Sequence, residues 1–263
     1  MTLSERHISL RFKLTFISLR SFLLLLVGIS YSLNGLSQEA HYPHFTLWSR
    51  IQLAKEPSPN WKFSGTLLWR RQNNYSVSPH NPLTNPLMAG GQALVTYRNT
   101  PNTFWVHIAQ ISYMKTNQLL GKTEDFNAPI GQEIRYAGGI EFNQEKEGSK
   151  FTFRERFMQE IRFFKANNYQ PVGRVRARAT ARYELTPFVS LNGVTEILFH
   201  DPPLLPNQTS LRFHQFWLGG SFLWSLSERV SLETGYTFIH GRRATIIEFD
   251  EQNILNLHLA VDI

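Results

Sequence analysis

Hydrophobic and polar residues alternate with a period of two along most of the chain after Gln38, and the spacing of amphipathic helices is hard to find there. This alternation predicts an all-β protein. Several alternating segments exceed ten residues, whereas most strands of soluble sheets have about five or six. We expect eleven strands, at residues 44–56, 61–73, 91–99, 103–116, 131–145, 150–165, 172–185, 188–200, 212–226, 230–242 and 252–263.

The connections between these segments alternate in length. Short ones fall at 57–60, 99–102, 146–149, 186–187 and 227–229, and long ones at 74–90, 117–130, 166–171, 201–211 and 243–251. Tight turns at one end and long loops at the other are typical of a transmembrane barrel whose short turns face the periplasm. The pattern therefore predicts an antiparallel up-and-down transmembrane β-barrel of ten to twelve strands.

The strand count raises a difficulty, because bacterial barrels made from one chain have an even number of strands. If the C-terminus lies in the periplasm, an odd count makes segments 44–56 and 252–263 run in the same direction. An even barrel needs either one more strand, hidden in 75–90 or before His44, or a different division of one of the eleven segments. We therefore favour twelve strands.

Segment 172–185 indicates which face of the barrel is polar. Arg174, Arg176, Arg178 and Arg182 share one face, and mostly small or apolar residues share the other. Each arginine facing lipid costs up to about 2–4 kcal/mol near the bilayer midplane. Several of them would cost on the order of 10 kcal/mol, more than a marginally stable fold can absorb. These arginines should therefore point into the barrel.

Neighbouring segments place acidic and basic residues on the same face, which predicts a charge ladder in the lumen. The ladder is expected to contain Arg154, Arg156, Glu160, Arg162, Arg174, Arg176, Arg178, Arg182, Glu196, Glu133, Arg135 and Glu141. Aromatic residues gather near strand ends, as membrane–water interfaces require. These interface residues are expected to be Trp48, Trp61, Trp69, Tyr183 and Trp224.

A secreted soluble sandwich is the alternative fold, because it also alternates polar and apolar residues, with its arginines facing water. Strand length, the alternation of short and long loops and the apolar segment 252–263 favour the membrane barrel.

The first 37 residues have the layout of a secretory signal peptide. A basic start is followed by the apolar stretch 22–33, and small residues precede a cleavage point between Ser37 and Gln38. An N-terminal membrane anchor is the alternative, but a spanning helix needs about 20 apolar residues. We expect export, with residues 38–263 forming one barrel in the outer membrane of a Gram-negative bacterium.

Charge and composition exclude some function classes. The chain has a net charge of +7; residues 1–37 hold four basic residues and one acidic residue, so residues 38–263 carry +4. This value does not predict nucleic acid binding. The partners expected from the outer-membrane location are lipid and lipopolysaccharide. Cysteine is absent, which excludes disulfides and thiolate chemistry.

The sequence predicts no cofactor and no metal site. His41 and His44 are three residues apart beside Pro43, so they do not share one helical face as metal ligands. His240 lies on the apolar face of its segment, where outer-membrane lipid hydrolases place the histidine of a Ser–His pair, but no serine has a convincing partner position. We expect a non-catalytic protein, with a phospholipase or lipid A deacylase type of enzyme as the alternative.

The predicted lumen charges support two non-catalytic roles. In a small barrel they fill the interior as a hydrogen-bonded plug. In a wider, porin-like barrel the same ring is a constriction that favours anions. The sequence thus predicts a role in membrane structure, binding or narrow-channel transport.

Several strand motifs resemble the uncharacterised domain-of-unknown-function 2490 family over most of residues 44–263. They are Arg154-Glu-Arg-Phe, Arg174-Val-Arg-Ala-Arg, Tyr183-Glu-Leu, Gly235-Tyr-Thr-Phe and Asn253-Ile-Leu-Asn-Leu-His-Leu. The resemblance implies an outer-membrane barrel and supplies no catalytic or ligand residues. The last strand is similar to the terminal signal read by the barrel-assembly machinery, but it ends in Ile263 where an aromatic residue is common.

Overall fold

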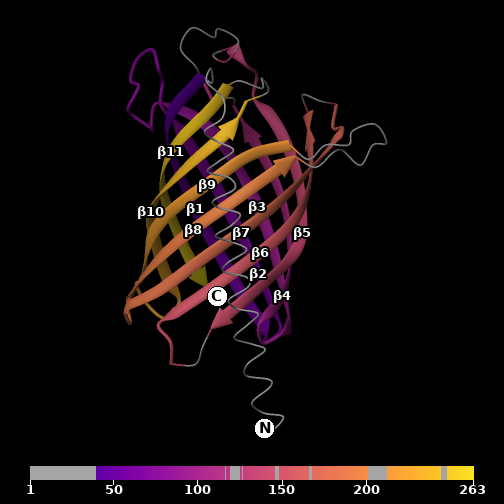
Figure 1. The fold of residues 1–263 in the computed structure, drawn as a ribbon, viewed down its shortest axis with the longest axis vertical. Helices are drawn as coiled ribbons and strands as arrows, with labels where there is room; N and C mark the ends of the chain where they lie inside the picture. Colours follow the sequence, from indigo (N-terminus) through magenta and orange to yellow (C-terminus); the bar gives the residue numbers. More distant parts are fainter. Residues whose placement is uncertain are drawn as a thin grey trace, which may run out of the picture. The chain divides into compact units, whose positions relative to one another are not determined.

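Eleven strands form one closed barrel in the computed structural model (Figure 1). The structure describes residues 40–115, 117–118, 125, 127–145, 148–165, 168–200, 212–243 and 248–263. The predicted signal peptide, residues 1–37, lies outside these ranges. The strands are β1 (Ala40–Ser58), β2 (Trp61–Gln72), β3 (Asn85–Thr100), β4 (Thr103–Met114), β5 (Gly131–Glu145), β6 (Phe151–Phe164), β7 (Pro171–Thr186), β8 (Val189–His200), β9 (Arg212–Ser225), β10 (Val230–Arg242) and β11 (Glu248–Asp262).

The eleven strands coincide with the eleven predicted segments, which confirms the all-β barrel. The largest differences are earlier starts, by six residues in β3 and by four in both β1 and β11. The preference for twelve strands was wrong. Residues 85–90 and 40–43, where a further strand was expected, extend β3 and β1, and the described strands close into a ring without a twelfth.

The ring closes between β1 and β11, which lie side by side in Figure 1 as its indigo and yellow ends. The backbone N–H of Ile263 donates to the carbonyl of Ala54 (2.8 Å), and the side-chain amide of Asn253 donates to the carbonyl of His44 (3.4 Å). Both pairs are 209 residues apart in the sequence. A constant separation means that these two strands run parallel, as an odd count requires. All other neighbouring strands pair antiparallel.

Short and long connections alternate, as the sequence predicted. The turns after the odd-numbered strands β1 to β9 are tight, and at their end of the barrel backbone hydrogen bonds tie neighbouring hairpins together. These bonds run from Arg98 to Asn60, from Asn143 to Asn102, from Glu184 to Lys150, from Ser225 to Phe188 and from Asp262 to Arg229. We call this the tight-turn end and the opposite one the long-loop end.

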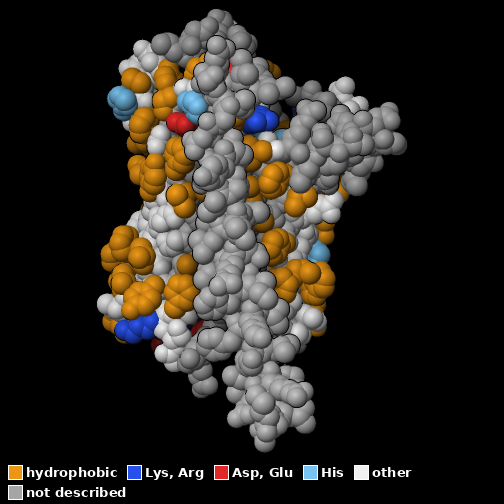
Figure 2. Space-filling model, in the orientation of Figure 1, with side chains coloured by type: hydrophobic (Ala, Val, Ile, Leu, Met, Phe, Trp, Pro, Cys, Tyr) orange, Lys and Arg blue, Asp and Glu red, His pale blue; other side chains and the backbone are white. Residues whose placement is uncertain are grey.

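The two faces of the wall differ in chemistry, because successive side chains of a strand point to opposite faces. Outward positions carry exposed apolar residues on every side of the ring, such as Leu67, Phe157, Leu218 and Leu255. Figure 2 shows hydrophobic side chains spread over the outer wall, with the visible charged side chains toward its two ends. Within the described residues, no helix has the length and apolar character needed to cross a membrane.

Part of the interior is apolar. Val106, Ile108, Ala137 and Met158, from β4, β5 and β6, form a buried cluster inside the barrel. Elsewhere the inner wall carries further buried apolar residues, such as Leu198, Ile239 and Ile254, together with many polar and charged side chains. The polar and charged side chains form the candidate site.

Candidate functional site in the barrel interior

The predicted charge ladder lies on the inner wall of β5, β6, β7 and β8. The alternation places all twelve of its residues on the inward positions of these strands. Glu133, Glu160 and Glu196 are fully or almost fully buried, and ion pairs link them to arginines of the same and neighbouring strands. Burial of a carboxylate is costly unless charged hydrogen bonds compensate it, so the partners of each acid decide whether this arrangement is stable.

Glu160 and Glu196 hold the centre of the network. Glu160 contacts the guanidinium groups of Arg174 and Arg176, each at 2.5 Å. Arg176 also reaches Glu196 (2.5 Å), and Arg178 contacts the other oxygen of Glu196 (2.7 Å). Two acids and three arginines thus form one continuous chain across β6, β7 and β8.

Two further acids extend the network toward β5. Glu133 contacts Arg135 of its own strand (2.9 Å) and Arg162 of β6 (2.5 Å). Glu141, nearer the tight-turn end, pairs with Arg156 at 2.5 Å. Because arginine stays charged and its planar fork bonds carboxylates in fixed directions, these pairs lock neighbouring strands in register.

Aromatic rings extend this charged layer across the interior. Trp48 of β1 meets Trp217 of β9 edge to face (ring centroids 5.5 Å apart), and the guanidinium of Arg70 lies 3.5 Å from the centroid of a Trp48 ring. The guanidinium of Arg176 lies 5.9 Å from a Trp217 ring. Cation–π contacts of this kind hold the two guanidinium groups against the rings.

The position of Trp48 corrects one prediction. Trp48 was expected at a membrane interface near a strand end, but β1 begins at Ala40, so the residue lies within a long strand and points inward. The four other predicted interface residues are exposed on the outward face, with fractional exposures of 43% for Trp61, 45% for Trp69, 46% for Tyr183 and 39% for Trp224.

A cavity of about 330 Å³ occupies the interior toward the tight-turn end. Four guanidinium groups line it, from Arg50, Arg154, Arg178 and Arg182, against a single carboxylate, Glu233. Its other lining residues are Trp48, Thr152, Thr180, Asn192, Val194, Trp217, Gly220, Ser221, Leu223, Thr237, Asn256 and His258. The cavity is therefore strongly basic.

The cavity arginines differ in how far they are neutralised. Arg178 is paired with Glu196, and Arg50 lies 3.8 Å from Glu233. Within the described part of the chain, neither Arg154 nor Arg182 forms an ion pair, and the Nε–H of Arg182 is buried without a hydrogen-bond acceptor. Two guanidinium groups are thus available to an anion in this space.

At the long-loop end, polar contacts reach across the barrel opening. Asp125, from the connection between β4 and β5, accepts two hydrogen bonds from Arg243 after β10 (2.9 and 3.0 Å). Asn117, from the same connection, donates to Asp250 of β11 (3.5 Å). Since β4 and β5 lie far around the ring from β10 and β11, these contacts place part of the connection over the opening.

Charge and burial shift the pKa values of two groups near this opening. Burial lowers the pKa of the Arg243 guanidinium, but Asp250 and Asp125 outweigh it and raise the pKa above its usual value. Burial raises the pKa of Tyr75, which packs edge-on against His44, to about 12. Both groups therefore keep their protons at neutral pH.

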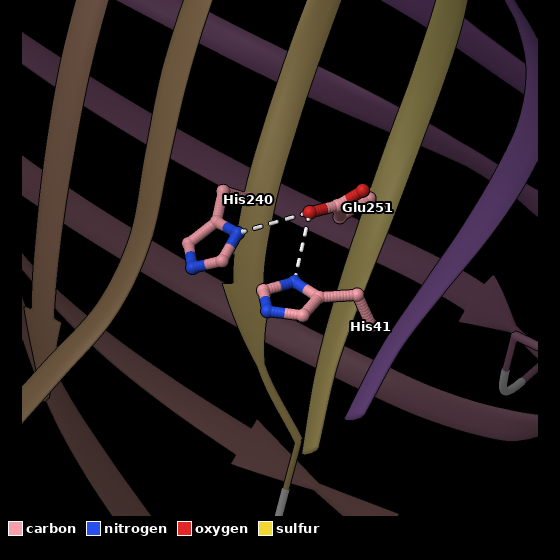
Figure 3. Close-up of side chains that lie close together, drawn as sticks. All are labelled: His41, His240 and Glu251. Atoms are coloured by element: carbon pink, nitrogen blue, oxygen red, sulfur yellow. Dashed lines mark hydrogen bonds and ion pairs between the residues drawn. The ribbon is translucent and has the colours of Figure 1, made fainter. Parts of the chain in front are cut away.

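His240 lies on the outward face near the long-loop end, together with two residues that the sequence did not connect to it. Its Nδ1 lies 3.7 Å from Oε1 of Glu251, and Nδ1 of His41 lies 2.9 Å from the same oxygen (Figure 3). His44, which the sequence did not favour as a second metal ligand beside His41, points inward to Asp250 (3.1 Å). In the sequence, only the expected common direction of segments 44–56 and 252–263 could have suggested that His41, His240 and Glu251 lie close together.

Comparison with known proteins supports the family suggested by the strand motifs. Residues 45–249 match the family described as "Protein of unknown function (DUF2490)". No curated protein matches the chain. Because the match covers most of the chain, including the charged wall of β5 to β8 and most of the cavity lining, this barrel belongs to the DUF2490 family.

Proposed function

We propose that this protein is a non-catalytic outer-membrane β-barrel of a Gram-negative bacterium, exported by a signal peptide in residues 1–37 and cleaved between Ser37 and Gln38. The observation that carries the proposal is the opposite chemistry of the two faces of the same strands. Apolar side chains cover the outside, whereas buried Arg and Glu fill much of the inside. This arrangement suits a lipid environment around the barrel. It is the reverse of the arrangement in a soluble protein, which has polar residues outside and apolar residues inside.

Within that location, the interior is better suited to binding than to free passage. The Arg–Glu network, the Trp48–Trp217 pair and the contacts over the long-loop opening all occupy the path of a solute. The basic cavity lies on the tight-turn side of these obstacles. We therefore propose that the cavity binds small anionic groups from the periplasmic side and that the wild-type barrel conducts little.

Location can be tested by membrane fractionation. The protein should appear in the outer-membrane fraction and should migrate faster on a denaturing gel before boiling than after it. Recovery as a soluble periplasmic protein would refute the membrane barrel.

Conductance in planar bilayers tests the interior. Folded wild-type protein should give little or no current. Trp48→Ala should raise the current, because the substitution removes one ring of the Trp48–Trp217 pair from the barrel interior. Trp61→Ala, which changes an outward ring, is the control and should leave the current unchanged. A large wild-type current would instead favour a porin-like channel.

Anion binding can be measured by calorimetry with inorganic pyrophosphate as the probe. The Arg154→Gln, Arg182→Gln double variant should bind it at least tenfold more weakly than wild type. Arg229→Gln, in an exposed tight turn, should bind like wild type. Equal affinity in all three proteins would remove the cavity from the proposal.

A lipid-modifying enzyme remains the alternative, and the His240–Glu251 contact on the outward face is the observation that favours it. Such an enzyme also needs a nucleophile for the histidine to activate. Incubation with phospholipid or lipopolysaccharide followed by mass spectrometry should show no product; a product would replace the non-catalytic proposal.

A further inference from the structure

We propose that His41, His240 and Glu251 form a binding site for a divalent transition-metal ion of the zinc type. The three side chains come from β1, β10 and β11 and converge on one point of the outer wall near the long-loop end (Figure 3). One potential ligand atom from each residue, two imidazole nitrogens and one carboxylate oxygen, lies within 4.8 Å of the other two.

The distances are close to those of a metal centre. A tetrahedral zinc ion with ligands at about 2.0–2.1 Å places its ligand atoms about 3.3 Å apart. The two distances to Oε1 of Glu251, 2.9 Å from His41 and 3.7 Å from His240, lie on either side of this value. Shifts of about an ångström, within the reach of small side-chain rotations, would complete the coordination of an ion by all three residues.

The donor set selects the class of ion. Imidazole nitrogens suit zinc, copper, nickel and iron, whereas calcium and magnesium prefer sites made only of oxygen ligands. Three protein ligands leave further coordination positions for water or an anionic oxygen. Partial exposure of the side chains of His41 (42%) and Glu251 (29%) gives an ion access from outside the barrel.

Neighbouring residues hold the two imidazoles in place. The ring of Phe249, which is 2% exposed, stacks on both imidazoles with interplanar angles of 16° and centroid distances of 5.6 Å to His41 and 4.5 Å to His240. His240 and Glu251 are also direct partners in the β10–β11 register. An orientation fixed before binding lowers the entropy lost when the ion binds.

The location gives the ion a structural consequence. His41 belongs to β1, while the two other ligands belong to β10 and β11, so a bound ion links strands across the parallel closure of the barrel. Parallel pairing is slightly weaker per residue than antiparallel pairing. The metal would therefore stabilise the barrel at its closing pair, and this inference is independent of what the interior binds.

The test uses folded, untagged protein in detergent, because a histidine tag would itself bind the ion. Titration with ZnCl₂ in a calorimeter should give one site per chain. His41→Ala, His240→Ala and Glu251→Gln should each weaken the affinity for zinc at least tenfold. Zinc should raise the temperature of the heat-modification transition of the wild type and not that of these variants. With Co²⁺ as a spectroscopic probe, wild type should show the visible absorption of a four- or five-coordinate site.

The matched control is His107→Ala, because His107 also faces outward and its Nδ1 lies 2.8 Å from the hydroxyl of Tyr136 rather than beside a carboxylate. It should bind zinc like wild type. The gel shift of unboiled protein verifies that each variant is folded. No zinc binding by wild type, or equal binding by the three site variants, would overturn the proposal.

Discussion

The side-chain amide of Asn253 donates to the backbone carbonyl of His44 across the closure between the last and the first strand. The same side chain accepts a hydrogen bond from the hydroxyl of Tyr236 on β10 (2.5 Å). Asn253 thus connects three strands at the one place where neighbouring strands run parallel. Side-chain bonds at this place supplement a backbone pairing that is geometrically less favourable than the others.

Replacing Asn253 with alanine should therefore weaken the barrel more than the same change at Asn256. Asn253→Ala removes two hydrogen bonds and should cost about 1–2 kcal/mol, whereas Asn256→Ala removes one, to Thr237, and should cost about 1 kcal/mol. Urea unfolding in detergent, followed by the loss of the gel shift, measures both. Equal losses would show that the side-chain bond to β1 contributes nothing.

Glu160→Gln should be among the most damaging conservative substitutions in the chain. The acid is fully buried and contacts Arg174 and Arg176, so the neutral amide leaves two buried guanidinium groups with too little negative charge. We expect a loss of about 3–5 kcal/mol in the free energy of unfolding.

Glu141→Gln is the matched control for this substitution. Among the described residues, Glu141 pairs with Arg156 alone, and its side chain is more exposed than that of Glu160, so its loss should be about 1–2 kcal/mol. Chemical unfolding of both variants in lipid vesicles provides the comparison. If Glu160→Gln lowers the free energy of unfolding no more than Glu141→Gln does, then solvent, rather than the Arg–Glu network, compensates the charges of the buried arginines.

Much of the fold could be predicted from the sequence because a barrel wall imposes a period of two on every strand. The inward direction of Arg174, Arg176 and Arg178 was derived from the energy of arginine in lipid, and the structure places all three inside. The same alternation indicated eleven strands, and only the preference for an even number was wrong. Alternation says nothing about how the first and last strands meet, and a parallel closure allows an odd count.

Less of the candidate sites could be predicted. The sequence places Trp48 and Arg50 on one face, but only the ring order of strands shows that Trp217 and Glu233 come close to them. Contacts between the ends of the chain, such as that of His41 with Glu251, depend on the same closure, and no local sequence pattern indicates them.

Gly139 should tolerate no side chain, although glycine usually weakens a strand. A Cβ atom there would lie 2.0 Å from the carbonyl oxygen of Phe157 and 2.8 Å from Cα of Met158, so β5 and β6 would have to separate. Gly139→Ala should cost about 1–3 kcal/mol. Gly193→Ala is the control, because a Cβ meets nothing within 4 Å there. Thermal gel-shift curves compare the two, and similar curves would contradict the close approach.

Arginine scanning of the outer wall separates a membrane barrel from a soluble one. Leu67 is 69% exposed on the outward face of β2, between Ile51 of β1 and Gly91 of β3 in the register. If lipid surrounds this position, Leu67→Arg should cost about 2–4 kcal/mol. In a soluble barrel the same change would expose a charge to water and cost almost nothing.

Val77→Arg provides the reference for that substitution, because Val77 is 77% exposed but lies in the connection between β2 and β3. Folding of both variants into lipid vesicles, measured by urea titration, should show a loss for Leu67→Arg and none for Val77→Arg. The difference should shrink in a bilayer thin enough to leave residue 67 near its interface, because the cost of arginine depends on depth. Equal stability of the two variants in every bilayer would place the outer wall in water.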